Sequence, residues 1–199
     1  MRKLLVAMVI LGLVAWWYFA WYSRRSNGAA TKDSDIPAVR VDESALTEAG
    51  RRLLNDVKSR IETLRSHPND TKRKFEVAKG VANDLRLLGD YHSAAEWYLK
   101  YGEWFESLTP QERRTAKVLT IDGGPPVGAP FEGHWMASVC YLLAGNQRAA
   151  FEAMEAFMQK YPNDPRKPTM MAHYRNAKKD LSRYVETLSH FRANPRFLK

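Results

Sequence analysis

Residues 131–164 read FEGHWMASVCYLLAGNQRAAFEAMEAFMQKYPND, and their pattern predicts two amphipathic helices joined by a tight turn at Gly145-Asn146. Small residues let two antiparallel helices approach closely, and larger apolar residues fill the remaining space. Gly145 suits the left-handed position that ends the first helix, and Pro162 stops the second. The residues expected at the contact between the helices are Ala137, Ser138, Tyr141, Ala150, Met154 and Phe157.

This unit of about 34 residues resembles a tetratricopeptide repeat (TPR), a helix-turn-helix module of that length. The matching positions are Ala137, Ser138, Tyr141, Gly145, Ala150 and the closing run Tyr161-Pro162-Asn163-Asp164. A weaker copy lies upstream, at Val81, Ala82, Leu85, Gly89-Asp90-Tyr91, Ala94, Tyr98 and Tyr101. The upstream copy lacks the closing proline, and Phe157 and Tyr101 stand where the family usually has a small residue. The resemblance implies an all-α, TPR-like domain, an α-solenoid of helical hairpins, over residues 44–191.

The resemblance also implies a groove that binds a partner. In TPR proteins, the first helix of each hairpin faces a concave surface that holds peptides or helices. Carried over to this chain, the groove residues are Lys79, Asn83, Arg86, Trp135, Val139 and Leu142. Basic and polar groups at one end and apolar groups at the other suit an amphipathic or acidic segment. The alternative is a shallow groove partly filled by the Gly/Pro-rich loop or by the last helix.

The amino-terminal residues predict a membrane anchor. Leu4–Tyr22 has no charged residue and is long enough, as a helix, to cross the hydrocarbon core of a bilayer. Its boundary residues are Leu4, Trp16, Trp17, Tyr18, Trp21 and Tyr22, of which the aromatic ones favour the headgroup region. Residues 1–25 are therefore interpreted as an uncleaved, single-pass signal-anchor, and the alternative is a cleaved secretory signal. A short, basic amino terminus is hard to translocate, which predicts that it stays inside and that the domain lies outside. The brief leader and compact architecture suggest a bacterial protein, for which this means an inner-membrane anchor and a periplasmic domain.

A polar tether and a first helix are expected to follow the anchor. Residues 26–43 lack periodicity and read as the tether. Asp42 or Ser44 is expected to cap a helix from about Ala45 to Ser66. The apolar stripe of this helix is predicted to be Leu46, Ala49, Leu53, Val57, Ile61 and Leu64.

The upstream hairpin is predicted from helices over residues 71–88 and 91–107. Its second helix carries Trp97, Tyr98, Tyr101, Trp104 and Phe105. Aromatic residues between helices are usually core, which we favour over the alternative of a cofactor pocket. Because Trp104 and Phe105 are adjacent, one of the two is expected to face outward for a partner.

Residues 109–130 interrupt the repeat pattern. Thr109-Pro110-Gln111-Glu112 predicts a capped short helix through Val118. The Gly/Pro-rich insertion at about residues 119–130 could suggest phosphate binding, but no Gly-Lys-Ser/Thr follows and its prolines remove backbone donors. We expect it to cover a helix end or to contact a partner.

A last helix from about Thr169 to Phe191 is expected to cover the end of the stack. Its apolar side is predicted to be Met171, Tyr174, Ala177, Leu181, Tyr184, Val185 and Leu188. The opposite side is a basic surface of Arg175, Lys178, Lys179 and Arg183, followed by a basic tail over residues 192–199. This surface is either a solvated cap or a binding surface for anionic lipid headgroups or an acidic protein.

No catalytic or metal-binding motif is found in the sequence. His67, His92, His134, His173 and His190 have no shared spacing on one helix, and Cys140 is expected to be a small core residue. We therefore expect no enzymatic activity, no metal, no cofactor and no nucleic-acid partner. The function expected is a membrane-anchored scaffold, assembly factor or accessory subunit of an inner-membrane complex. The alternatives are a structural subunit held by its transmembrane helix and, third, an envelope enzyme or cofactor-binding protein.

Overall fold

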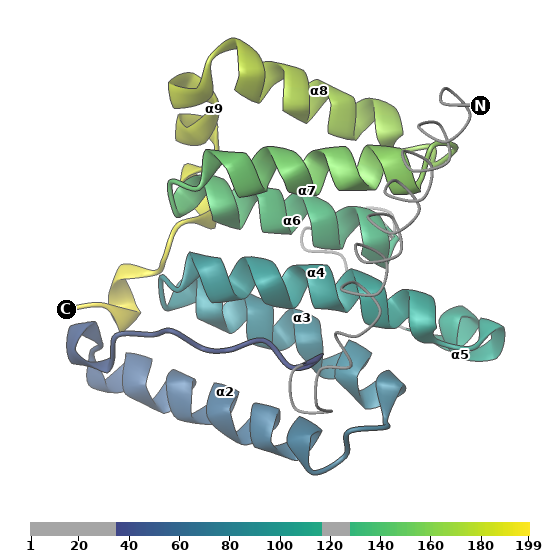
Figure 1. Ribbon diagram of the computed structural model, residues 1–199. Helices are drawn as coiled ribbons and strands as arrows, with labels where there is room; N and C mark the ends of the chain where they lie inside the picture. Colours follow the sequence, from purple (N-terminus) through teal and green to yellow (C-terminus); the bar gives the residue numbers. More distant parts are fainter. Residues whose placement is uncertain (1–34, 117–127) are drawn as a thin grey trace, which may run out of the picture. The chain divides into compact units, whose positions relative to one another are not determined.

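The computed structural model describes residues 35–116 and 128–199, and Pro37–Lys199 form one compact unit (Figure 1). This confirms an all-α fold, because the described residues form helices and a single isolated bridge, with no strand. The α-helices are α2 (Glu48–Arg65), α3 (Thr71–Leu87), α4 (Tyr91–Ser107), α5 (Pro110–Thr115), α6 (Ala129–Leu143), α7 (Gln147–Lys160), α8 (Lys167–Lys179) and α9 (Leu181–Thr187). The 3₁₀ helices are η2 (Glu43–Ala45), η3 (Ser189–Phe191) and η4 (Pro195–Phe197).

Both predicted hairpins are present, α3 with α4 and α6 with α7. Their turns use the expected glycines, since φ is +83° at Gly89 and +75° at Gly145. The next residue caps the following helix in each case. The side chains of Asp90 and Asn146 each accept a backbone N–H three residues later, at 3.1 Å. The same local chemistry therefore makes both turns.

The helices stack in chain order, with α2, the α3/α4 hairpin, the α6/α7 hairpin and α8 following one another (Figure 1). The most extensive packing is between α4 and α6, and glycines permit it. A Cβ atom on Gly133 would lie 2.6 Å from the Tyr98 carbonyl oxygen, and one on Gly102 would lie 3.4 Å from Pro130 Cα. The two backbones are thus closer than larger residues would allow.

The aromatic residues of α4 form core, as predicted. Trp97, Tyr98, Tyr101 and Trp104 are all buried. Phe105 is half-buried, and its ring centroid lies 5.4 Å from that of Phe75 on α3. Of the adjacent pair Trp104 and Phe105, the tryptophan points inward.

The first helix differs from its prediction at its start. Asp42 caps the short helix η2, while the side chain of Thr47 accepts the Gly50 N–H and caps α2. The helix therefore begins at Glu48 rather than at Ala45. Leu54, rather than the predicted Leu53, is fully buried. Leu46 is 1% exposed but precedes the helix.

The predicted last helix is two helices. It breaks at Asp180, whose backbone is extended and whose side chain accepts the Arg183 N–H at 3.0 Å. The break lets α9 turn so that the Tyr184 hydroxyl lies 2.9 Å from His173 Nδ1 on α8. The buried residues of this region are Met170, Ala177, Tyr184, Leu188 and Phe191, so Met170 replaces the predicted Met171.

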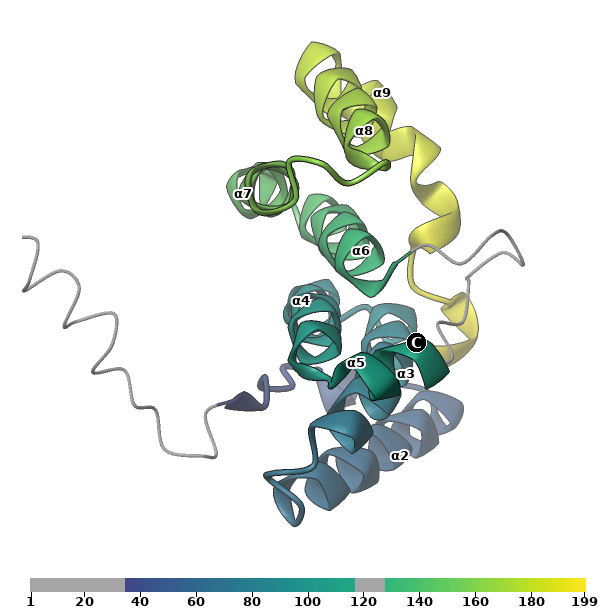
Figure 2. The same ribbon diagram turned by 90° about the vertical axis from the view of Figure 1, so that its right-hand side faces the viewer.

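The predicted basic tail is part of the packed unit. Residues 188–199, named here the C-terminal segment, run from α9 along the stack past α6 and α3 to α2 (Figure 2). The Asn194 N–H donates to Leu87 O, Thr47 N–H donates to Phe197 O, and Lys199 N–H donates to Ala45 O. Phe197 and Leu198 pack on a buried cluster of Leu46, Leu54 and Leu88.

The end of the predicted tether is packed as well. Val39 and Val41 contact the same cluster as Phe197, and the Arg40 N–H donates to Asp90 at 2.7 Å. The compact unit therefore begins at Pro37 and ends at Lys199, which extends the predicted domain of residues 44–191 at both ends.

Two predicted segments fall wholly or largely outside the described residues. These are the anchor Leu4–Tyr22 and residues 119–127 of the insertion. The last two residues of the insertion, Ala129 and Pro130, are the first two residues of α6. The predicted capping box of Thr109 and Glu112 is present, and α5 ends at Thr115. Within residues 35–116 and 128–199, no helix has the length and apolar character needed to cross a membrane.

Candidate partner-binding surfaces

The six predicted groove residues lie on α3 and α6, the first helices of the two hairpins. We call the surface that they form the inner face: Lys79, Asn83, Arg86, Trp135, Val139 and Leu142. Val139 is 0% exposed and Leu142 is 4% exposed, so neither offers surface to a partner in this structure. The other four side chains are half-buried.

Lys79 joins the two hairpins through a buried ion pair. Its Nζ lies 2.7 Å from Oε1 of Glu132 on α6, and the two side chains are only 11% and 2% exposed. The Tyr101 hydroxyl approaches the other carboxylate oxygen at 3.5 Å. Burial raises the pKa of Glu132 above the usual glutamate range, although the Lys79 ammonium opposes this. This arrangement ties α3, α4 and α6 together.

Asn83 and Arg86 are also engaged within the unit. The Tyr98 hydroxyl of α4 donates to Asn83 Oδ1. Arg86 Nη1 donates to the Phe191 carbonyl oxygen at 2.8 Å, and its guanidinium lies 5.8 Å from the Phe191 ring centroid. The polar residues that were predicted to contact a partner therefore bind other groups of this chain.

Trp135 packs against the C-terminal segment. Its ring centroid lies 5.5 Å from that of Phe191, edge to face, and 5.5 Å from that of His173. Burial raises the pKa of the neighbouring Tyr184 to about 12 and lowers the pKa of His173. One end of the inner face is therefore occupied by Phe191, which agrees with the alternative that the last helix partly fills the groove.

An exposed stripe next to the inner face lies toward the start of α3. Lys72 and Glu76 are exposed on the same stripe of the helix as Lys79. Their charged groups lie 4.0 Å apart. This stripe carries both signs of charge beside the buried Lys79 and Glu132 pair.

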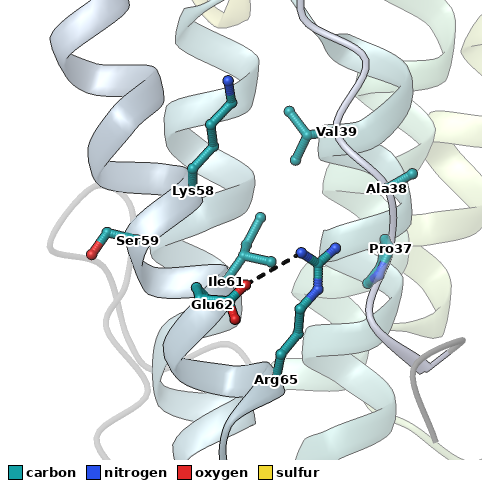
Figure 3. A pocket seen from close by; sticks show the side chains of 8 residues that line it. All are labelled: Pro37, Ala38, Val39, Lys58, Ser59, Ile61, Glu62 and Arg65. Atoms are coloured by element: carbon teal, nitrogen blue, oxygen red, sulfur yellow. Dashed lines mark ion pairs between the residues drawn. The ribbon is translucent and has the colours of Figure 1, made fainter.

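A pocket lies beside α2. A pocket of about 620 Å³ separates α2 from the extended residues Pro37–Val39 (Figure 3). Ile61 and Val39 give it an apolar floor, and an ion pair of 3.5 Å between Arg65 and Glu62 closes one side. The Arg65 guanidinium projects between α2 and Pro37–Val39 but is already paired with Glu62 (Figure 3).

The four residues of the predicted basic surface are all exposed. Arg175, Lys178 and Lys179 share one face of α8, and Arg183 lies in the first turn of α9. Lys178 Nζ lies 4.6 Å from the Phe151 ring centroid and 5.4 Å from that of Tyr174. Two half-buried aromatic rings therefore border the basic surface.

Chemistry-bearing side chains are scattered in the described part of the chain. No three His, Cys, Asp or Glu residues come close enough there to hold a metal ion. Cys140 is buried, as predicted, and burial raises the pKa of its thiol to about 12, so it is not a reactive thiolate at neutral pH.

Sequence reasoning missed Glu132 and Phe191, which organise the inner face. One feature of the sequence indicated Glu132: it lies three residues before Trp135 and hence on the same stripe of the helix. No feature of the sequence indicated Phe191, because its partners Arg86 and Trp135 are distant in the sequence and come close to it only in the folded chain.

Comparisons with models of protein families, with curated proteins and with solved structures found no match to this chain.

Proposed function

We propose that this protein is a membrane-anchored, TPR-like scaffold that binds a partner protein through the inner face of its helical hairpins. It acts as an assembly factor or accessory subunit of a bacterial inner-membrane complex, with its domain in the periplasm. Anchoring raises the local concentration of the partner at the membrane, and the hairpins orient it.

One observation carries the proposal: the inner face already holds a chain segment. Phe191 sits against Arg86 and Trp135, and Arg86 binds its backbone carbonyl oxygen. A ring held by an aromatic residue and a carbonyl held by an arginine are contacts that a partner peptide makes with such a surface. The exposed stripe at Lys72 and Glu76 continues this face and supports a partner segment of mixed charge beside the C-terminal segment.

The test is a pull-down of the full chain from native membranes in mild detergent. The tag belongs at the amino terminus, because the Lys199 N–H and Nζ are bonded to Ala45 and Ser44. The test variant exchanges the charges of the exposed pair on the inner stripe, Lys72→Glu with Glu76→Lys, which keeps the net charge. The matched control exchanges the exposed pair on α7, Arg148→Glu with Glu152→Arg, whose charged groups lie 2.7 Å apart.

A stoichiometric complex that is lost on exchange of the α3 pair and kept on exchange of the α7 pair supports the proposal. A complex that survives both exchanges but disappears when residues 4–22 are replaced by an unrelated apolar sequence overturns it. That result would identify a structural subunit held by its transmembrane helix.

A further inference from the structure

The positive charge of this chain is concentrated at its two ends. Residues 1–25 hold four basic and no acidic residues, and residues 165–199 hold nine basic and two acidic residues. Residues 26–164 between them hold 18 basic and 20 acidic residues. The net charge of +9 therefore comes from the flanks of the predicted anchor and from the last helices.

Many basic residues elsewhere in the unit form ion pairs with acidic side chains. Arg52, Arg60 and Lys160, for example, pair with Glu48, Asp84 and Glu106. In contrast, no ion pair within the described residues involves Arg175, Lys178, Lys179 or Arg183, a set that we call the basic face.

Of the acidic residues near the basic face, Glu155 and Asp180 accept hydrogen bonds within the chain, and Glu186 is exposed on α9. Glu155 accepts the Tyr174 hydroxyl at 2.6 Å, and Asp180 caps α9 by accepting the Arg183 N–H at 3.0 Å. Like charges gathered on one surface repel one another, and an external anion relieves that repulsion. The basic face is thus complementary to a negatively charged surface.

We propose that the basic face of α8 and α9 docks on anionic lipid headgroups of the membrane in which the protein is anchored. The inference rests on the anchoring in the proposed function but not on the inner face. The 14 residues between Tyr22 and Pro37, when fully extended, span about 50 Å, which keeps the domain near the bilayer.

Two further features favour a lipid surface over an acidic protein. Phe151 and Tyr174 border the face, with ring centroids 5.3 Å apart, and aromatic rings beside basic groups suit the headgroup region. The face is also borne by the helices at one end of the stack, so it can meet a planar surface (Figure 1). Each basic residue near an anionic surface favours docking roughly fivefold.

The experiment uses the full chain reconstituted in phosphatidylcholine vesicles, with and without phosphatidylglycerol. A fluorophore is attached through Asn176→Cys, an exposed position on α8, and in a second sample through Asn55→Cys on α2. The native Cys140 is buried and does not compete for the label. Quenching by lipids that carry a nitroxide on the headgroup reports how close each position lies to the membrane.

The proposal predicts quenching at position 176 at least about threefold greater in anionic than in neutral vesicles, falling away in about 0.5 M salt. Position 55 should show little dependence on lipid charge. The variant Arg175→Glu, Lys178→Glu, Lys179→Glu and Arg183→Glu should lose the quenching at position 176. A control with the same change of charge at exposed sites, Arg52→Glu, Lys58→Glu, Arg65→Glu and Arg114→Glu, should keep it.

Equal quenching in neutral and anionic vesicles, or equal loss in both charge variants, would overturn the proposal. Flotation of the protein with neutral vesicles tests anchoring separately. A failure of docking with intact flotation therefore leaves the anchor standing, and a failure of flotation rejects the proposed function as well.

Discussion

Glu132 illustrates how a single residue defines the interior of this protein. It is only 2% exposed, and its carboxylate faces Lys79 and Tyr101 across three helices. A buried ion pair of this kind adds little net stability but is costly to break, because one partner would stay buried and uncompensated. Its contacts join α3, α4 and α6.

Glu132→Gln gives a test through pH. Burial raises the pKa of folded Glu132 above its ordinary value of 4.5, so the folded state keeps a proton that the unfolded state releases. The stability of the natural protein relative to this variant should therefore fall as pH rises through the raised pKa, and then level off. Urea unfolding of both proteins from about pH 4 to pH 8 measures the difference, and a rise over this interval would contradict the assignment.

Gly133→Ala and Gly145→Ala distinguish two structural reasons why a position requires glycine: a close approach of two backbones and a positive φ. Gly145 has φ of +75° and open space around it, so alanine should lower the free energy of unfolding by about 1 kcal/mol through backbone strain. At Gly133 an added Cβ would meet the Tyr98 carbonyl oxygen at 2.6 Å, which should cost about 3 kcal/mol by forcing α4 from α6. Urea unfolding compares them, and equal costs would refute the close approach.

The two glycines also mark what sequence could predict at this scale. Gly145 was predictable because a turn between two amphipathic patterns requires a left-handed residue. Gly133 was not, because its role depends on which helix faces α6. The same reasoning explains why the buried aromatic residues of α4 were predicted, while Glu132 was not.

At the scale of elements, the hairpins followed their sequence patterns, and the ends of the domain did not. The break at Asp180 replaced one expected helix by two, because a capping aspartate and the Tyr184 to His173 contact outweigh helix continuity. Likewise Thr47 rather than Ser44 caps α2, since its hydroxyl also donates to the Arg196 carbonyl oxygen at 2.9 Å. In both cases a contact with another element of the fold determined where the helix begins or ends.

The C-terminal segment behaves as a structural element, and deleting Pro195–Lys199 tests this. The deletion uncovers Leu46, Leu54 and Leu88 and should lower the free energy of unfolding by at least about 2 kcal/mol. Urea denaturation of the full chain measures it. As a control, Arg196→Ala alters only an exposed side chain and should change stability by less than about 0.5 kcal/mol. A neutral deletion would mean that these residues do not stabilise the buried cluster.

At the scale of the whole molecule, the C-terminal segment contacts a surface that the TPR resemblance assigns to partner binding. Phe191 reaches Arg86 from 105 residues away in the sequence. Local patterns cannot encode contacts of such separation, so the sequence indicated the inner face but not its partial occupation. The region left for a partner is the exposed stripe of α3 around Lys72 and Glu76.

The most direct test of partner binding is site-specific photocrosslinking of the full chain in native membranes. A photoreactive residue replaces Glu76 on the inner stripe of α3, and in a second sample it replaces Glu152, which is exposed on α7. The proposed function predicts one discrete crosslinked partner from position 76 and none from position 152. The same partner captured from position 152, or no capture at position 76 while the complex still copurifies, would contradict it.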